Sequence, residues 1–226
     1  TESLRYLNTI PALNDIQEED LAFLAEQFQE KVFSVDTKIA AEESHSDGFF
    51  VIIRGTVRIE KESILLRIAQ PGCIIGAYET LNGFPFWASF IADSPVTALK
   101  LGTSSISKQL GNKPKLIDKL WLFAGIDMAE RLLVKIEPYA SWRIKKLRNF
   151  INTGDIVSLK SGEKFELNNM VIILLKGEVT EDGERVLSAP SLISEGQVKA
   201  NFKSTLFIVN KEKLLEANDL RLNFKI

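Results

Sequence analysis

The sequence predicts an α+β protein: a β-roll of the jelly-roll type with flanking helices, followed by a smaller second unit that is also roll-like. Three observations lead to this expectation. Residues 31–101 contain short apolar stretches of strand length, separated by turn signals such as Pro71-Gly72. Helical periodicity precedes this region and follows it. The strand pattern then resumes after residue 153, with local sequences that echo the first region.

Composition restricts the class of protein. The chain has 226 residues, of which 45% are hydrophobic and 26% charged, as is typical of a globular protein in water. No stretch approaches the roughly 18 consecutive apolar residues that a membrane-spanning helix needs. A formal net charge of −2 argues against a nucleic-acid partner. With one cysteine (Cys73) and one histidine (His45), we expect no enzyme: no catalytic residues, no metal ligands and no cofactor.

The first helices and strands are predicted from their apolar period. Residues 4–31 are predicted to be helical, because Leu21, Leu24 and Phe28 recur on one helix face. From residue 31 the period shifts towards two, which predicts strands at 31–35, 38–41, 48–53, 56–61, 63–69, 86–92 and 95–101.

Residues 103–151 return to the helical period. Pro138 is expected to end a first helix, and a second is predicted over about 139–151. The first helix carries a broad apolar stripe, formed by Leu116, Leu120, Phe123, Met128, Leu132 and Ile136. This stripe either packs on the roll or forms the contact of a homodimer.

The last part of the chain is predicted to repeat the first. Residues 157–165 echo 33–39, and residues 173–179 echo 53–57 with the residues before them. Further strands are predicted at 185–187, 191–193, 198–202 and 205–209, with a closing helix over 211–217. We expect a truncated second roll without a ligand pocket. The expected domains are 1–110, a helical connector 111–152, and 153–226.

Residues 74–89 form the stretch on which the functional interpretation depends. They predict a strand, a tight turn at Gly76, one short helical turn, a Gly83-Phe84-Pro85 turn and a second strand. A glycine followed by a helix start gathers backbone N–H groups, and such a group can bind an anion.

This stretch resembles the phosphate-binding cassette of cyclic-nucleotide-binding domains. It matches that pattern without a gap at Gly76, Leu81, Gly83, Pro85 and Ala88, with Ser89 in place of a threonine. In that family a glutamate holds the ribose hydroxyl and an arginine pairs with the cyclic phosphate. The matching positions here are Ala77 and Phe86. Loss of both charge-assisted hydrogen bonds costs roughly 3–6 kcal/mol, or about two to four decades of affinity. We therefore expect a cyclic-nucleotide-binding-like fold whose degenerate pocket does not bind cAMP or cGMP.

The order of the motifs is also similar to the cytosolic region of salt-overly-sensitive type sodium/proton antiporters from plants. Residues 76–86 are close to the Gly-Leu-Tyr-Glu-x-Leu-x-Gly-x-Pro-Tyr pattern of that region, and Trp121 and Leu174-Leu175-Lys176-Gly177 follow in order. The resemblance implies a regulatory region on the cytoplasmic side of the plasma (inner) membrane. Its partner would be the membrane-embedded antiporter domain of the same polypeptide, which we expect to precede residue 1. Such a region acts by docking differently to two transporter states.

Several side chains are candidates for this docking. On the cassette helix, either Tyr78 packs and Glu79 is a solvated or capping carboxylate, or the two residues mark a contact with another domain or with the membrane domain. Phe84, Phe86 and Trp87 either fill the former pocket or form an exposed apolar patch. A basic run is either a solvated helix face or a contact for anionic lipid head groups, and comprises Arg143, Lys145, Lys146 and Arg148.

Two other functional classes compete with a regulatory module. A nucleotide-responsive transcription regulator of the catabolite-activator type has the same order of roll and helices, but it needs a C-terminal helix-turn-helix. Here residues 155–209 alternate as strands. A cupin-like enzyme needs several histidine ligands, and this chain has only His45.

Overall fold

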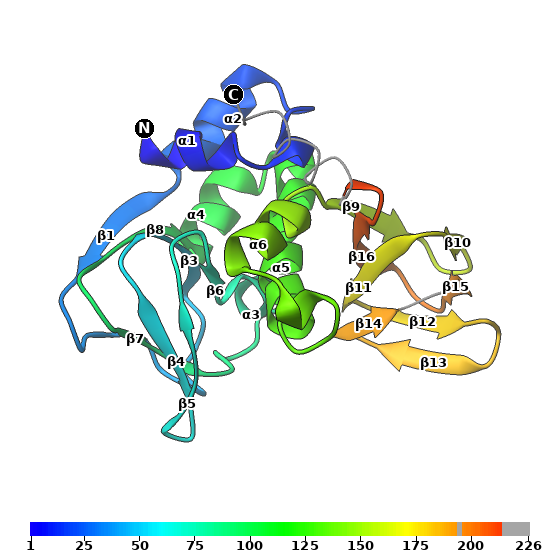
Figure 1. The fold of residues 1–226 in the computed structure, drawn as a ribbon. Coiled ribbons are helices and arrows are strands. Elements are labelled where there is room, and N and C mark those ends of the chain that lie inside the picture. The colour runs from blue at the N-terminus through cyan, green and yellow to red at the C-terminus, as the bar shows by residue number, and fades with distance from the viewer. Residues whose placement is uncertain (194–195, 214–226) are drawn as a thin grey trace, which may run out of the picture. The chain divides into compact units, whose positions relative to one another are not determined.

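The computed structural model describes residues 1–193 and 196–213. By its internal contacts the chain forms two compact units (Figure 1). Unit 1 comprises Thr1–Thr9 and Leu13–Asp127, and unit 2 comprises Ile10–Ala12 and the chain from Met128 on. The three-part division expected from the sequence stays a prediction.

Unit 1 begins with short helices rather than one long one. Helix α1 covers Glu2–Leu7, the 3-10 turn η1 covers Pro11–Leu13, and α2 covers Glu18–Glu26. The predicted helical region over 4–31 is wrong in two places: the helix is interrupted between Leu7 and Glu18, and it ends at Glu26. Pro11 lacks the N–H that a continuing helix needs, and residues from Gln29 on already pair in a strand.

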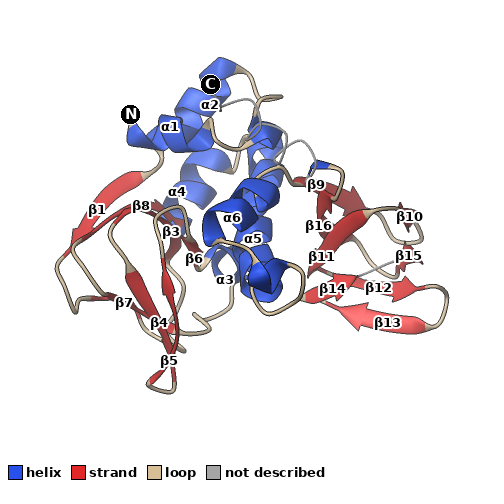
Figure 2. Ribbon diagram, viewed as in Figure 1, coloured by secondary structure: helices blue, strands red, loops and turns tan. Residues whose placement is uncertain are grey.

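Eight strands then form a roll of two antiparallel four-stranded sheets (Figure 2). The strand order is β1-β8-β3-β6 in one sheet and β2-β7-β4-β5 in the other. The bounds are β1 Gln29–Phe33, β2 Lys38–Ala40, β3 Gly48–Arg54, β4 Val57–Lys61, β5 Ile64–Ala69, β6 Ile74–Ile75, β7 Ser89–Ala92 and β8 Val96–Gly102. Their inward side chains form one apolar cluster that includes Phe50, Ile59 and Phe90.

The helices after the roll are α4 (Thr103–Ser105), the π-helical η2 (Ile106–Leu110), α5 (Pro114–Leu133), η3 (Tyr139–Ser141) and α6 (Ile144–Ile151). Helix α5 ends five residues before Pro138, so the predicted helix end there is wrong. Its apolar stripe is largely buried, and the Phe123 ring lies 5.2 Å from that of Phe49 in β3. This burial agrees with the packing interpretation of the stripe, and the homodimer contact stays a prediction.

Unit 2 repeats the roll strand for strand. Its sheets have the orders β9-β16-β11-β14 and β10-β15-β12-β13, which match those of unit 1 when eight is added to each strand number. The bounds are β9 Asp155–Leu159, β10 Lys164–Leu167, β11 Met170–Lys176, β12 Glu178–Glu181, β13 Arg185–Ser188, β14 Ser191–Ile193, β15 Gly196–Ala200 and β16 Ser204–Asn210.

The second roll is complete in its strands, so the expectation of a truncated roll needs correction. What it lacks is the segment between its sixth and seventh strands. That connection has 2 residues between Ile193 and Gly196, against 13 between Ile75 and Ser89. A closing helix is predicted over 211–217. From residue 214 on, this helix lies outside the described residues.

The turns show which positions of the two rolls are equivalent. The N–H of Asp36 donates to Ala92 O at 2.8 Å, and the N–H of Gly162 donates to Ala200 O at 2.7 Å, both residues having positive φ. This pairs Asp36 with Gly162, two residues away from the register that the sequence suggested. The second echo is confirmed, because Gly55 and Gly177 occupy the same turn at φ 83° and 94°.

We expect Gly177→Ala to destabilise unit 2 by about 1–3 kcal/mol, because it forces a side chain into a left-handed conformation. A Cβ there would also lie 2.7 Å from Lys203 O. Urea unfolding followed by tryptophan fluorescence measures the change. Gly183→Ala is the control, since its φ of 78° is similar but no heavy atom lies within 4 Å of its Cβ position. Equal losses for the two variants would contradict the role of close packing.

Candidate degenerate nucleotide site

The cassette forms as the sequence predicts. After β6, Gly76 turns the chain at φ 75°, helix α3 follows over Ala77–Asn82, and Gly83 ends it at φ 71°. The N–H of Thr80 donates to Gly76 O at 2.9 Å, and that of Phe84 donates to Glu79 O at 2.9 Å. The predicted strand over 86–92 starts three residues later, at Ser89.

Phe86, at the position of the family's arginine, lies directly over the glycine turn. A Cβ on Gly76 would meet the Phe86 Cε1 atom at 2.4 Å, so the ring occupies the space above that residue. Only 3% of Phe86 is exposed, and its ring lies edge-on to that of Phe90 at 6.2 Å. Its backbone is fixed as well: its N–H donates to Ser44 O, and its carbonyl accepts from Glu43 N–H.

Of the other two ligand positions, Ala77 is buried and Ser89 is half-buried. Ala77, at the position of the glutamate, is fully buried and supplies no carboxylate. Ser89 Oγ accepts a hydrogen bond from the Glu42 N–H at 3.0 Å, which holds the edge of β7 to the neighbouring loop. The cassette therefore keeps its backbone shape, while its side chains give an apolar filling in place of polar ligands.

A carboxylate of the chain itself lies at the start of the cassette helix. Asp127 on α5 accepts the N–H of Tyr78 at 3.1 Å, and both residues are buried. This N–H lies in the first turn of α3, where intrahelical acceptors are lacking and negative charge is stabilised. Our sequence analysis missed Asp127. The available signal was a single acid in the otherwise apolar run of residues 120–129.

We expect Asp127→Ala to lower the free energy of unfolding of unit 1 by about 1–3 kcal/mol, since the buried Tyr78 N–H loses its acceptor. Asp127→Asn keeps an acceptor oxygen and should lose less. Amide hydrogen exchange at Tyr78 reads the contact directly. Asp118→Ala, at an exposed site on the same helix, should change stability by no more than about 0.5 kcal/mol. An unchanged Tyr78 exchange rate in Asp127→Ala would contradict the assignment.

The remaining candidates separate into buried and exposed groups. Tyr78 and Glu79 are buried, so the expectation that Glu79 is solvated is wrong. Trp87 packs against the apolar cluster, with its ring 6.4 Å from that of Phe90. Phe84 differs from them, because 49% of it is exposed.

The basic run divides in a similar way. Arg143 and Lys145 are exposed, while Lys146 Nζ lies 4.2 Å from the centroid of the Trp142 ring. Arg148 is buried, and its Nη2 lies 3.0 Å from Glu130 Oε1. Arg148 therefore belongs to the interior of unit 2 and does not contribute to a solvated basic face.

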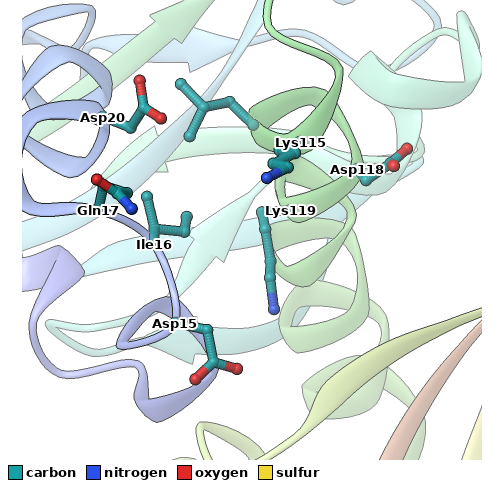
Figure 3. Close-up of a pocket in the computed structure, with 8 residues that line it drawn as sticks. Asp15, Ile16, Gln17, Asp20, Lys115, Asp118 and Lys119 are labelled. Atoms are coloured by element: carbon teal, nitrogen blue, oxygen red, sulfur yellow. The ribbon is translucent and has the colours of Figure 1, made fainter.

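Unit 1 also has a surface pocket of about 340 Å³ beside α5 (Figure 3). Lys115 and Lys119 lie on one side of it, and Asp15, Gln17 and Asp20 lie on the other. The lysines and the aspartates therefore face each other across the pocket. Asp20 also forms an ion pair with Lys113 Nζ at 2.6 Å. Across the described part of the chain, no group of three or more His, Cys, Asp or Glu side chains could hold a metal ion.

Comparison with known proteins shows what the first roll is similar to. Residues 30–112 match the family model of the cyclic nucleotide-binding domain. The cGMP-dependent protein kinase, isozyme 1, of Drosophila melanogaster is 29% identical over 125 residues, which are 52% of this chain and 16% of the kinase. Sodium/hydrogen exchanger 7 of Arabidopsis thaliana is 25% identical over 174 residues, which are 73% of this chain and 15% of the exchanger. The chain thus spans less than a fifth of either relative.

Solved structures agree on the fold. The regulatory subunit of a cAMP-independent protein kinase A from Trypanosoma brucei superposes with a TM-score of 0.50 at 14% identity, covering 97% of this chain and 87% of that one. A cyclic nucleotide-binding domain from Methylobacillus flagellatus gives a TM-score of 0.50 at 24% identity, covering 60% and 83%. The expected cyclic-nucleotide-binding-like β-roll with flanking helices and a second β-rich unit is confirmed. Within the described ranges, no helix combines the length and apolar character needed to cross a bilayer.

Proposed function

We propose that this chain is a cytosolic, non-catalytic regulatory region of a sodium (cation)/proton antiporter, and that its degenerate pocket does not respond to cAMP or cGMP. Domains of the cyclic nucleotide-binding type are regulatory. The alignment with the Arabidopsis exchanger extends over 73% of the chain and so reaches beyond the residues of the first roll. On this proposal the region lies on the cytoplasmic side of the membrane and works by docking to the transport domain of its own polypeptide.

The single observation that carries the proposal is the position of Phe86. Its ring packs on Gly76 and into the interior of the roll, at the position where the family has its phosphate-binding arginine. A cyclic phosphate would need both the space of this ring and a counter-charge. Binding without them would leave a buried anion uncompensated, which proteins avoid because desolvation costs several kcal/mol per ion.

A transcription regulator of the catabolite-activator type is less well supported. After α6, the described residues of unit 2 form eight strands, where this class of regulator has a helix-turn-helix. The formal net charge of −2 also argues against a nucleic-acid partner. We further propose that Arg143 and Lys145 on the exposed face near α6 can contact anionic lipid head groups, worth about 1 kcal/mol for each charge near the surface.

Transport assays on the parent polypeptide test the regulatory role. The parent is reconstituted in vesicles with and without residues 1–226, and proton-coupled cation exchange is followed by a pH-sensitive dye. We expect removal to change the exchange rate severalfold in one direction and leave exchange detectable, and millimolar cAMP to have no effect. A rate that is unchanged on removal, or a parent without membrane-spanning segments, would contradict the proposal.

A further inference from the structure

One edge strand of unit 1 exposes an unusual amount of aliphatic surface. Strand β5 ends its sheet, and within the described ranges it pairs with β4 alone. Four of its side chains are strongly exposed: Ile64 by 64%, Leu65 by 51%, Leu66 by 47% and Ile68 by 42%. The β4–β5 hairpin extends away from the rest of its roll in Figure 1. An exposed apolar edge with unpaired backbone groups is a template for pairing with another strand.

The local geometry explains why these side chains gather at the edge. Glu62 and Ser63 both have positive φ and form a tight hairpin turn of the type that matches strand twist. The register between β4 and β5 then shifts between Ile59 and Glu60, which adds a residue on the β5 side. Such a bulge changes which face the following residues occupy, so consecutive aliphatic residues remain outside the core.

The second roll shows that the fold itself does not require this surface. Its equivalent edge strand, β13, is shorter, and Val186, at 57%, is the one aliphatic residue that it exposes strongly. Arg185 at the start of that strand pairs with Glu181 at 3.6 Å. Charged residues and short length are the usual protection of an edge strand, and β5 is longer than β13 and carries Arg67 as its one charged residue.

We propose that β5 pairs antiparallel with β5 of a second copy of this chain, forming a two-fold symmetric dimer. With Leu66 facing its own counterpart across the axis, Ile64 faces Ile68 of the other copy and Leu65 faces Arg67. Leu66 and the two Ile64–Ile68 pairs then place aliphatic side chains opposite each other, and Arg67, the one charged residue of the strand, faces Leu65 and not its own copy. A two-fold contact must be self-complementary in this way.

The chemistry of the hairpin favours a protein strand over a lipid surface as the occupant. Acidic Glu60 and Glu62 accompany Lys61 at its tip, and Glu42 lies 3.7 Å from Lys61 Nζ. This surface therefore carries no excess of positive charge to attract anionic head groups. A contact limited to one strand per copy buries less than the ~1,200 Å² of stable complexes, so we expect a Kd on the order of 100 µM. The inference uses unit 1 alone and does not depend on the proposed function.

Sedimentation velocity from about 10 µM to about 1 mM tests the dimer. The wild-type chain should dimerise reversibly, and Leu66→Lys should stay monomeric over the whole range. Val186→Lys, at the equivalent edge of the second roll, is the matched control and should dimerise like the wild type. Both replaced residues are exposed, so circular dichroism should show that both variants fold like the wild type. A wild-type chain that is monomeric at 1 mM, or equal loss of dimer in both variants, would overturn the proposal.

Cysteine cross-linking tests the register. The native Cys73 is buried, so an introduced cysteine is the reactive thiol. Opposed residues of an antiparallel pair have Cα atoms about 4.5–5.5 Å apart, within reach of a disulfide. Leu66→Cys should therefore give a covalent dimer under mild oxidation at least tenfold faster than Ile64→Cys or Val186→Cys. Similar rates for all three variants would contradict the pairing about Leu66.

Discussion

Replacing Phe86 with alanine is expected to lower the free energy of unfolding of unit 1 by about 3–5 kcal/mol, the range for a buried phenylalanine. The ring lies in the apolar cluster of the roll and is 3% exposed, so its removal leaves a cavity over the Gly76 turn. Urea unfolding followed by the fluorescence of nearby Trp87 measures the loss. The effect is large because the ring is a structural part of the roll as well as an obstacle to ligand.

Phe84→Ala is the control for this experiment, because it removes the same side chain two residues away in the same cassette. Phe84 is 49% exposed and contacts the Tyr78 ring at 6.1 Å. Its removal should cost less than about 1 kcal/mol. If Phe86→Ala were as mild as Phe84→Ala, the ring would not be filling the former pocket, and the account of the site would be wrong.

Glu130→Ala is expected to destabilise unit 2 by about 3–5 kcal/mol, because it leaves the Arg148 guanidinium as a buried charge without this carboxylate. The two side chains join α5 to α6 with an N–O distance of 3.0 Å. The fluorescence of Trp142, next to α6, reports on this part of the chain. Asp118→Ala on the same helix is exposed and should be nearly neutral.

A double replacement separates the net contribution of the ion pair to the free energy of unfolding from the destabilisation caused by removing only one partner. Glu130→Leu with Arg148→Met removes both charges and keeps similar volumes, so it should recover most of the loss seen in Glu130→Ala. A double variant that is no more stable than Glu130→Ala would show that other contacts of these two side chains carry the effect.

The sequence predicts the rolls well because their signals are local. Alternating apolar residues predict the strands. The turns at Gly55, Gly76 and Gly177 need a positive φ, and each lies where the sequence predicts a turn. Helix ends were predicted less well. Helix α5 stops at Leu133, five residues before Pro138, and the apolar period carries no signal for that end.

The candidate site could be predicted only along the cassette itself. Ala77 and Phe86 are visible as departures from a motif, and their burial agrees with the loss of ligand chemistry. Asp127 lies 49 positions away from its partner Tyr78. Arg148 looks like part of a surface run until its neighbour across the fold, Glu130, is known. Contacts between distant segments of this kind have no local signature.

Calorimetric titration with cAMP and with cGMP, each to millimolar concentration, tests the central claim most directly. Phe86 and Ala77 give the roll an apolar interior where the nucleotide would need a cation and a carboxylate. We predict no saturable heat for either nucleotide below about 1 mM, given the roughly 3–6 kcal/mol of lost hydrogen bonds. Saturable binding with a micromolar Kd would contradict this account.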